Sequence, residues 1–144
     1  MRSILFVEKV FLSCNAKLLG GVELFNLCLI KDLASLGYSV TVPAHPAWGR
    51  IINNRTEDLS VEIINLPWNT SDLPGGLLVL TTLVARRFDL LLIGNVGDRL
   101  IPIISCLRWM NTYCRIVLIA HREPKTRFIH ALNRMPITVL AVNK

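Results

Sequence analysis

Short apolar runs alternate with longer amphipathic segments along the whole chain. The runs have the length and composition of strands, and they cover residues 3–7, 39–42, 61–66, 89–93, 115–120 and 137–142. The amphipathic segments have helical spacing, and they cover residues 22–36, 76–87, 100–110 and 124–134. This strict alternation predicts an α/β fold: a Rossmann-like three-layer sandwich with a mainly parallel six-stranded sheet. We expect the strand over 3–7 to lie near the centre of that sheet.

The first amphipathic segment carries an apolar stripe on one side of the predicted helix. At helical spacing this stripe comprises Val22, Phe25, Leu29, Leu33 and Leu36, with Lys31, Asp32 and Ser35 on another side. Gly37 follows the stripe, and glycine commonly ends a helix because it adopts left-handed backbone angles without steric cost. The stretch after the second strand, with Pro46, Trp48 and Gly49, predicts a loop.

Composition narrows the class of protein and its partners. The chain has 144 residues, enough for one domain with a substantial core, and 52% of them are hydrophobic while 18% are charged. The formal net charge is +6, which suits nucleic acid, an anionic membrane surface or a phosphorylated ligand. The tryptophans do not form a stacking series, so we expect no nucleic acid partner. Arginines at positions 50, 55, 86 and 87, together with the very apolar composition, would suit contact with an anionic membrane surface.

The cysteines and the chain start bear on the compartment. Cys14, Cys28, Cys106 and Cys114 lack the C-x-x-C spacing of metal or redox sites, so we expect no metal and buried thiols at Cys28 and Cys106. Glu8 and Lys9 interrupt the first apolar run, which is unlike a signal peptide. The longest apolar stretch is too short to span a membrane. These features predict a cytoplasmic protein, with peripheral contact at the inner membrane face as an option.

Two adjacent glycines, Gly20 and Gly21, stand between the first strand and the first helix. Backbone N–H groups at a helix start lack partners within the helix, and glycine allows another molecule to approach closely. Such a corner suits an anion, usually a phosphate. The alternative is a flexible loop entering the helix.

Several motifs, in their order, resemble the N-terminal half of GT-B glycosyltransferases, in particular the family 4 or glycogen-synthase-like group. They are Gly20-Gly21-Val22-Glu23, the phrase over 33–42 with Tyr38 in place of histidine, the strand over 88–93, the strand ending in His121, and the last residues 141–144 with Asn143 in place of serine. The resemblance implies that residues 1–144 form a single, acceptor-side Rossmann-like domain and that the C-terminal donor-binding domain is absent. The chain is then half of an enzyme that moves a sugar from a nucleotide-sugar donor to a sugar or lipid-linked acceptor.

The same resemblance supplies site residues. It implies that His121 is catalytic, facing the sugar or acceptor, and that Gly20, Gly21, Asn95 and Arg122 bind substrate. His121 also follows a strand, and ligands of open α/β sheets bind beyond the carboxyl ends of strands. The resemblance implies no cofactor and no metal, and partners in the form of a nucleotide-sugar donor, held with a second domain or chain, and the acceptor. Alone, this half is expected to be inactive.

Other functions find less support in the sequence. The G-x-G-x-x-G fingerprint of dinucleotide-binding enzymes and the G-x-x-x-x-G-K-[ST] motif of P-loop NTPases are both absent from the sequence. A phospho-receiver domain needs acids that Glu8 alone does not supply. The remaining alternative is a non-catalytic Rossmann-like module or subunit that docks a partner chain or a membrane surface.

Overall fold

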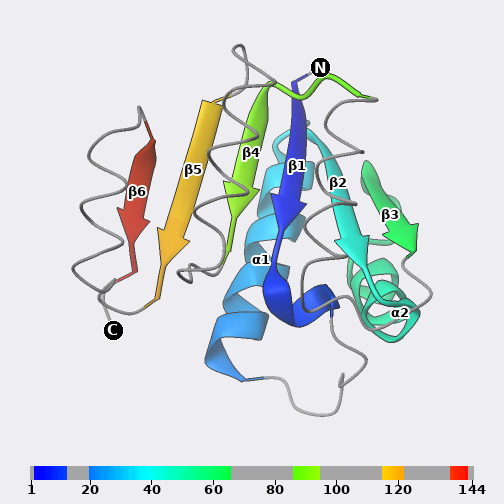
Figure 1. Ribbon diagram of the computed structural model, residues 1–144. Helices are drawn as coiled ribbons and strands as arrows, with labels where there is room; N and C mark the ends of the chain where they lie inside the picture. The colour runs from blue at the N-terminus through cyan, green and yellow to red at the C-terminus, as the bar shows by residue number, and fades with distance from the viewer. Residues whose placement is uncertain (1, 13–19, 66–85, 95–114, 122–136, 143–144) are drawn as a thin grey trace.

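The fold is a six-stranded, all-parallel sheet with helices packed on it (Figure 1). The computed structural model describes residues 2–12, 20–65, 86–94, 115–121 and 137–142. Its strands are β1 (Ser3–Val7), β2 (Ser39–Ala44), β3 (Val61–Asn65), β4 (Leu90–Ile93), β5 (Arg115–Ala120) and β6 (Thr138–Ala141). The predicted α/β Rossmann-like fold with six parallel strands is therefore confirmed.

The strand order is β3-β2-β1-β4-β5-β6, so β1 lies near the centre, as predicted. On one side β1 pairs with β2, Ile4 opposite Val40, and on the other side it pairs with β4, Ile4 opposite Leu90. The chain thus builds the sheet outward from β1 in one direction and then returns to build it in the other. Ligands of such sheets bind where the order reverses, outside the carboxyl ends of the strands on either side. In this fold that point lies between β1 and β4.

The described helices are α1 (Gly21–Ser35) and α2 (Pro46–Arg55), with the short 3-10 helix η1 (Lys9–Leu12) directly after β1. Helices α1 and α2 contact each other and cover the same face of the sheet (Figure 1). Because each leads from one parallel strand to the next, α1 begins at the carboxyl edge of the sheet and ends at its amino edge. Helix α1 therefore runs along the strands, from the edge where they end to the edge where they begin.

Both faces of the central strands are buried. Under α1 and α2 the core contains Phe6, Val42 and Trp48, each fully buried. Leu5 and Leu118 are also fully buried. Leu5 and Phe6 are neighbours in β1, so their side chains point to opposite faces of the sheet. Because both are fully buried, both faces of β1 are covered. Burial on both faces explains why β4 is continuously apolar, as expected for a parallel sheet.

The apolar stripe expected on α1 is wrong by part of a turn. The buried side chains of α1 are Asn26, Leu27, Ile30 and Ala34. Phe25 and Leu36, both assigned to the buried stripe, are 38% and 75% exposed. Apolar residues occur nearly all round this helix, so the spacing alone did not select the face. The packing of the helix against the sheet and α2 selected it.

The loop expected after β2 contains α2, which begins at Pro46. The His45 side chain caps this helix, since its Nδ1 accepts a hydrogen bond from the backbone N–H of Ala47 at 3.2 Å. Proline fits the first position of a helix because its missing N–H would have no partner there. Pro46 was therefore a signal of a helix start in the sequence, but the segment was interpreted as a loop.

Strand β2 also continues through Pro43, where we expected it to stop. The N–H of Ser39 faces β1, as its bond to the carbonyl of Arg2 shows, so alternation turns the nitrogen of Pro43 the same way. The pairing of β2 with β1 ends at Thr41. An N–H group at position 43 would thus have no partner in β1. Proline therefore removes no hydrogen bond of the sheet, and the strand continues through it.

Other expectations from the sequence have mixed outcomes. Cys28, expected to be buried, is exposed on α1, and the other cysteines lie outside the described residues. The expected helices over 100–110 and 124–134 also lie outside them, as does most of the one over 76–87, whose last residues, 86 and 87, are not helical. In the described part of the chain, no helix is long and apolar enough to cross a membrane.

Two glycines, one at each end of α1, have opposite backbone requirements, which gives a matched test of the fold. Gly37 has a φ of +90°, a conformation that costs a residue with a side chain about 1–2 kcal/mol. Gly21 is the first residue of α1, and a Cβ added there meets nothing within 4 Å. We expect Gly37→Ala to lower the free energy of unfolding by about that amount. Gly21→Ala should leave it unchanged or raise it by about 0.5 kcal/mol. Urea unfolding followed by circular dichroism measures both; equal effects would contradict the assigned helix end.

Candidate functional site

Four polar or small residues meet at the carboxyl edge of the sheet, where the strand order reverses. Glu8 follows β1, Gly94 follows β4 and His121 follows β5, while Asn26 comes from the second turn of α1. Because the strands are parallel, the residues that follow them share this edge (Figure 1). We call Glu8, Asn26, Gly94 and His121 the edge cluster.

The centre of the edge cluster is a buried hydrogen bond between Glu8 and Asn26. The Nδ2 group of Asn26 donates to Oε2 of Glu8 at 2.6 Å, and both residues are fully buried. The other carboxylate oxygen of Glu8 accepts a longer hydrogen bond from the backbone N–H of Val10 at 3.3 Å. A buried carboxyl group is costly unless it accepts hydrogen bonds, so these donors allow Glu8 to stay in the interior. The bond also ties α1 to the end of β1.

The hydrogen-bonded pair of Glu8 and Asn26 restricts position 94 to glycine. A Cβ built on Gly94 would overlap the carboxylate of Glu8 and lie 3.2 Å from Nδ2 of Asn26. The backbone N–H of Gly94 donates to the carbonyl of Val7 at 2.8 Å, which holds the end of β4 against the end of β1. The position therefore needs glycine because the polar pair fills the space that a side chain would occupy.

One atom of the pair lacks a partner. Oδ1 of Asn26 is buried and has no hydrogen-bond partner in the described part of the chain. Its direction is fixed, because the amide nitrogen of the same side chain is engaged by Glu8. An unpaired buried acceptor costs roughly 1–3 kcal/mol, so such a group is expected to bind a donor from a ligand or water.

His121 lies beside the first turns of α1. Its ring packs edge-on against Phe25, with 5.2 Å between ring centroids and 83° between planes. Its Nε2 is a second buried atom without a partner among the described residues. Burial lowers the pKa of His121 below its ordinary value, and the nearby Glu23 carboxylate opposes that shift without cancelling it. The imidazole is therefore neutral at pH 7.

The start of α1 already holds a negative charge from the chain itself. Gly20 is the N-cap residue and makes no side-chain capping bond. The carboxylate of Glu23, in the first turn, curls back so that its Oε2 lies 2.5 Å from a Cβ built on Gly20. A carboxylate at this place complements the positive end of the helix dipole, which is the role expected for a bound phosphate.

The sequence-predicted site is thus partly assembled. Gly20 and Gly21 open α1, and His121 contacts Phe25 one turn later, so the structure brings these three to one edge. Asn95 and Arg122, the other predicted substrate contacts, lie outside the described residues. The roles assigned to all five stay predictions. Among the described residues, no three His, Cys, Asp or Glu side chains group as metal ligands would.

Sequence reasoning missed Glu8 and Asn26 as site residues. Glu8 was noticed as an interruption of an apolar run and as an insufficient acid for a phospho-receiver domain, although an acidic residue directly after a central strand stands at the edge where ligands bind. Asn26 lies among apolar residues of α1, and a polar side chain on the buried face of a helix needs a partner. Both signals were readable once the correct face of α1 was known.

Comparison with known proteins gives the fold a context. No family model and no curated protein matches the sequence. Among solved structures, the chain is similar to MT0777, with a TM-score of 0.55, 13% identity, and coverage of 99% of this chain and 86% of that one. It is also similar to a phenylacrylic acid decarboxylase from Aquifex aeolicus, with a TM-score of 0.54, 13% identity, and coverage of 97% and 80%. At this identity the likeness shows the fold alone.

These neighbours overturn the expected membership of the GT-B glycosyltransferases, and with it the interpretation as half of a sugar-transferring enzyme. The physical reason lies in the motifs. An apolar strand, a glycine before a helix and a glycine after it serve any parallel α/β sheet, so their order does not single out one family. The nucleotide-sugar donor, the acceptor and the missing donor domain rested on that resemblance and stay untested.

The tight fit around Gly94 is open to a double-mutant test. We expect Gly94→Ala to lower the free energy of unfolding by roughly 1–3 kcal/mol, because the added methyl group overlaps the Glu8 carboxylate. In a Glu8→Ala background the same change should cost clearly less, since the overlap is removed. Gly20→Ala is the control, because its Cβ meets only the end of the flexible Glu23 side chain. Additive effects of Glu8→Ala and Gly94→Ala in urea unfolding would contradict this packing.

His121 gives the stability a defined pH dependence. Its pKa is lowered by folding, so between the folded pKa and the unfolded value of about 6.5 the unfolded chain binds more protons. The part of the free energy of unfolding that comes from a neutral His121 in the folded protein is fully present above pH ~6.5, and it is lost as the pH falls through the folded pKa. We expect His121→Gln to flatten the acid side of the stability curve, measured by urea unfolding across this range. Ser35→Ala, at the other end of α1, should keep the wild-type slope; the same flattening there would refute the assignment.

Proposed function

We propose that the chain is a Rossmann-like binding module whose ligand occupies the carboxyl edge of the sheet, above the edge cluster. The observation that carries this proposal is the buried Oδ1 of Asn26, which has no hydrogen-bond partner among the described residues and lies where the strand order reverses. Buried acceptors are normally satisfied, and open α/β sheets bind ligands at this point. A ligand that donates a hydrogen bond to Asn26 accounts for both facts.

The chemistry of the edge cluster favours a ligand with hydroxyl, amine or amide donors. Oδ1 of Asn26 can only accept. The carboxylate of Glu23 adds negative charge at the start of α1. A phosphate placed there would be repelled by Glu23, whereas a hydroxyl or amide would not.

An aromatic portion of the ligand has a surface to pack on. Phe25 and Leu24 are large apolar side chains that stay 38% and 43% exposed at the start of α1. Phe25 also contacts His121, so this apolar surface adjoins the edge cluster. Small-molecule sites commonly combine apolar walls with a few fixed polar groups. A nucleoside, with an aromatic base and ribose hydroxyls, has this combination.

Decarboxylation is the second candidate, and its support is narrower. One neighbour of the fold is a phenylacrylic acid decarboxylase, and Nε2 of His121, which has no hydrogen-bond partner among the described residues, could face the reacting group. A carboxylate substrate would, however, lie near the negative charge of Glu23. We therefore place binding of a donor-bearing ligand first and keep phenylacrylic acid as a probe.

The test follows nuclear magnetic resonance signals during titration with adenosine, adenosine monophosphate and phenylacrylic acid. We expect adenosine to shift the side-chain amide of Asn26 and the signals of Gly94 and His121. Asn26→Leu should weaken adenosine binding about 5–100-fold, the equivalent of one hydrogen bond to a buried acceptor. Asn53→Leu is the matched control, because Asn53 is exposed on α2.

Each result decides between the alternatives. Equal loss of affinity in the Asn26 and Asn53 variants, or no shift at the edge cluster with adenosine, would contradict the proposal. Binding of adenosine monophosphate at least about tenfold tighter than adenosine would instead support a phosphate at Gly20 and Gly21. Release of carbon dioxide from phenylacrylic acid would favour the second candidate.

A further inference from the structure

Three polar groups at the start of α1 have no partner in the part of the chain that the structure describes. Two of them are the buried atoms Oδ1 of Asn26 and Nε2 of His121. The third is the carboxylate of Glu23, which accepts no hydrogen bond and forms no ion pair with a described residue. An amide oxygen, a carboxylate and the unprotonated nitrogen of a neutral imidazole all accept hydrogen bonds. A ligand for this place must therefore bring donors.

The three groups are neighbours in space. Glu23 and Asn26 are three positions apart on α1, so their side chains leave the same side of the helix, with about 5–6 Å between Cβ atoms. The ring of His121 packs on Phe25, with 5.2 Å between ring centroids. Burial lowers the pKa of His121 and the carboxylate of Glu23 partly opposes that shift, so the charge of Glu23 acts on the imidazole. One small ligand can therefore reach all three groups.

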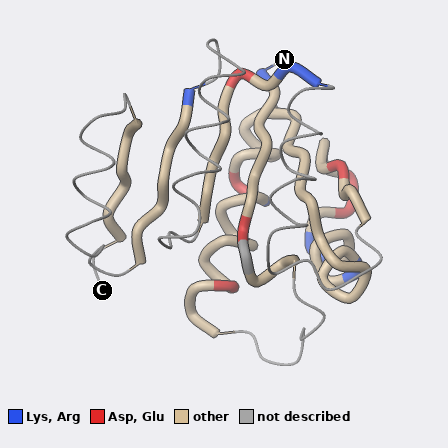
Figure 2. Tube along the Cα trace, viewed as in Figure 1, with Lys and Arg blue, Asp and Glu red and all other residues tan. Residues whose placement is uncertain are grey.

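Glu23 also decides the sign of the charge that this place accepts. It is the only charged residue in the first eight positions of α1, residues 21–28, and its carboxylate curls back toward the N-cap residue Gly20. Figure 2 shows acidic positions, in red, at the start of α1 and at the end of β1. The free N–H groups of the helix start therefore already face a carboxylate, which would repel a second anion and attract a cation.

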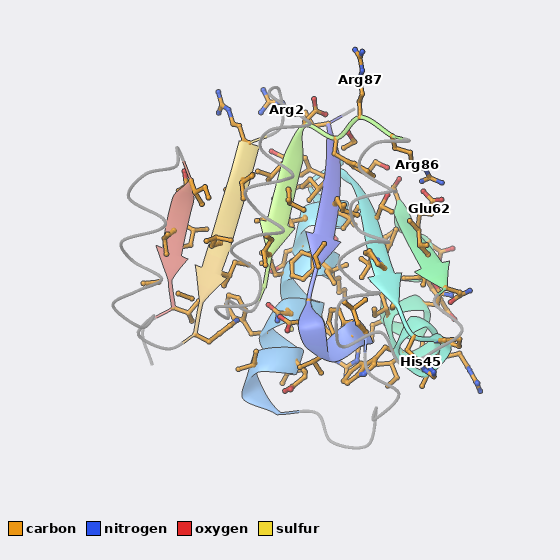
Figure 3. The ribbon with its side chains drawn as sticks, viewed as in Figure 1. Arg2, His45, Glu62, Arg86 and Arg87 are labelled. Carbon is orange, nitrogen blue, oxygen red and sulfur yellow. The ribbon has the colours of Figure 1, made fainter. Side chains whose placement is uncertain are left out.

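Three described arginines lie at the opposite edge of the sheet, where the strands begin. Figure 3 labels them as Arg2, Arg86 and Arg87. Arg86 is engaged there by Glu62 of β3 in a bidentate ion pair, at 2.5 and 2.8 Å. These arginines are therefore not the counter-charge of Glu23, and the neutral imidazole of His121 is not one either.

A primary ammonium group is the chemical complement of this arrangement. It carries three N–H donors, no acceptor and one positive charge. Phe25 is 38% exposed beside His121, and an aromatic ring at this distance from a site attracts a cation. A hydroxyl group has a single donor and would leave the charge of Glu23 without a partner.

We propose that the ligand of the edge cluster carries a protonated amine next to an aromatic group, and that Glu23 selects this amine over neutral and anionic ligands. The inference rests on the proposed function and narrows its ligand from any hydrogen-bond donor to a cationic amine. Because Oδ1 of Asn26 and Nε2 of His121 are buried, we expect the partly exposed Phe25 ring to turn outward as the amine enters.

The test compares three probes that share a phenyl group and differ in the charge of the head group: 2-phenylethylamine, 2-phenylethanol and 3-phenylpropanoate. Nuclear magnetic resonance follows their titration into the purified chain at pH 7. We expect the amine to bind at least about tenfold more tightly than the alcohol, because hydrogen bonds to an ionised group are roughly twice as strong as neutral ones. The carboxylate should bind most weakly. The shifted signals should include Gly21, the side-chain amide of Asn26 and His121.

The variant Glu23→Gln keeps the shape of the side chain and removes its charge. It should bind the amine no more tightly than the alcohol, while its affinity for the alcohol changes by less than about twofold. The pKa of His121 should fall further in this variant, because the opposing carboxylate is gone. Asp32→Asn is the matched control, since it removes the same charge from an exposed position farther along α1. An unchanged preference for the amine in Glu23→Gln, or equal loss in the two variants, would overturn the proposal.

The outcome also separates this inference from the proposed function. Shifts of the edge cluster with adenosine and 2-phenylethanol, without tighter binding of the amine, would show that the site is correct and that the selection of a cation is wrong. If none of the probes shifts these signals, both are wrong. Tight binding of the amine without binding of adenosine would support the amine and exclude the nucleoside.

Discussion

The buried hydrogen bond between Glu8 and Asn26 is the constraint on which the centre of this molecule depends. It places a carboxyl group at the end of β1, beneath α1, where the strand order reverses. The neighbouring groups are arranged by the space that this pair fills and by its hydrogen bond. Position 94 is glycine because the pair fills the space of a side chain, and the amide of Asn26 is turned so that its oxygen has no partner in the part of the chain that the structure describes. A group this costly to bury is retained at a ligand-binding edge more readily than in a purely structural core.

Helix α1 connects two edges of different chemistry. At its start stand the edge cluster, Glu23 and the apolar surface of Phe25, while its end, at the amino edge, leaves Leu36 exposed. The overall charge of +6 therefore says little about the edge cluster and the start of α1, where the described side chains are acidic or neutral. The net charge had suggested an anionic partner, and the free N–H groups expected at Gly20 and Gly21 had suggested a place for a phosphate. The placement of Glu23 against Gly20 shows why net charge is a poor guide to a single site.

The glycosyltransferase resemblance failed for an instructive reason. Its motifs were the strand, the glycine before α1 and the glycine that ends α1, and each has a local physical cause in this fold. Gly37, for instance, is required by a φ of +90°. Features that any parallel sheet needs carry information about architecture and little about chemistry. The solved structures with a similar fold, MT0777 and a phenylacrylic acid decarboxylase, agree with that architecture at only 13% identity.

The sequence alone determined the alternation of strands and helices, the parallel sheet and the central position of β1. These follow from local hydrophobic periodicity and from the handedness of crossovers, which act on short stretches of chain. Tertiary structure decided which face of α1 is buried, because apolar residues occur nearly all round that helix and only its packing against the sheet and α2 distinguishes them. It also decided that β2 passes through Pro43, since that depends on where the pairing with β1 ends. The candidate site was also decided by the tertiary structure. Its residues, Glu8, Asn26, Gly94 and His121, are far apart in sequence, and only the order of the strands brings them to one edge.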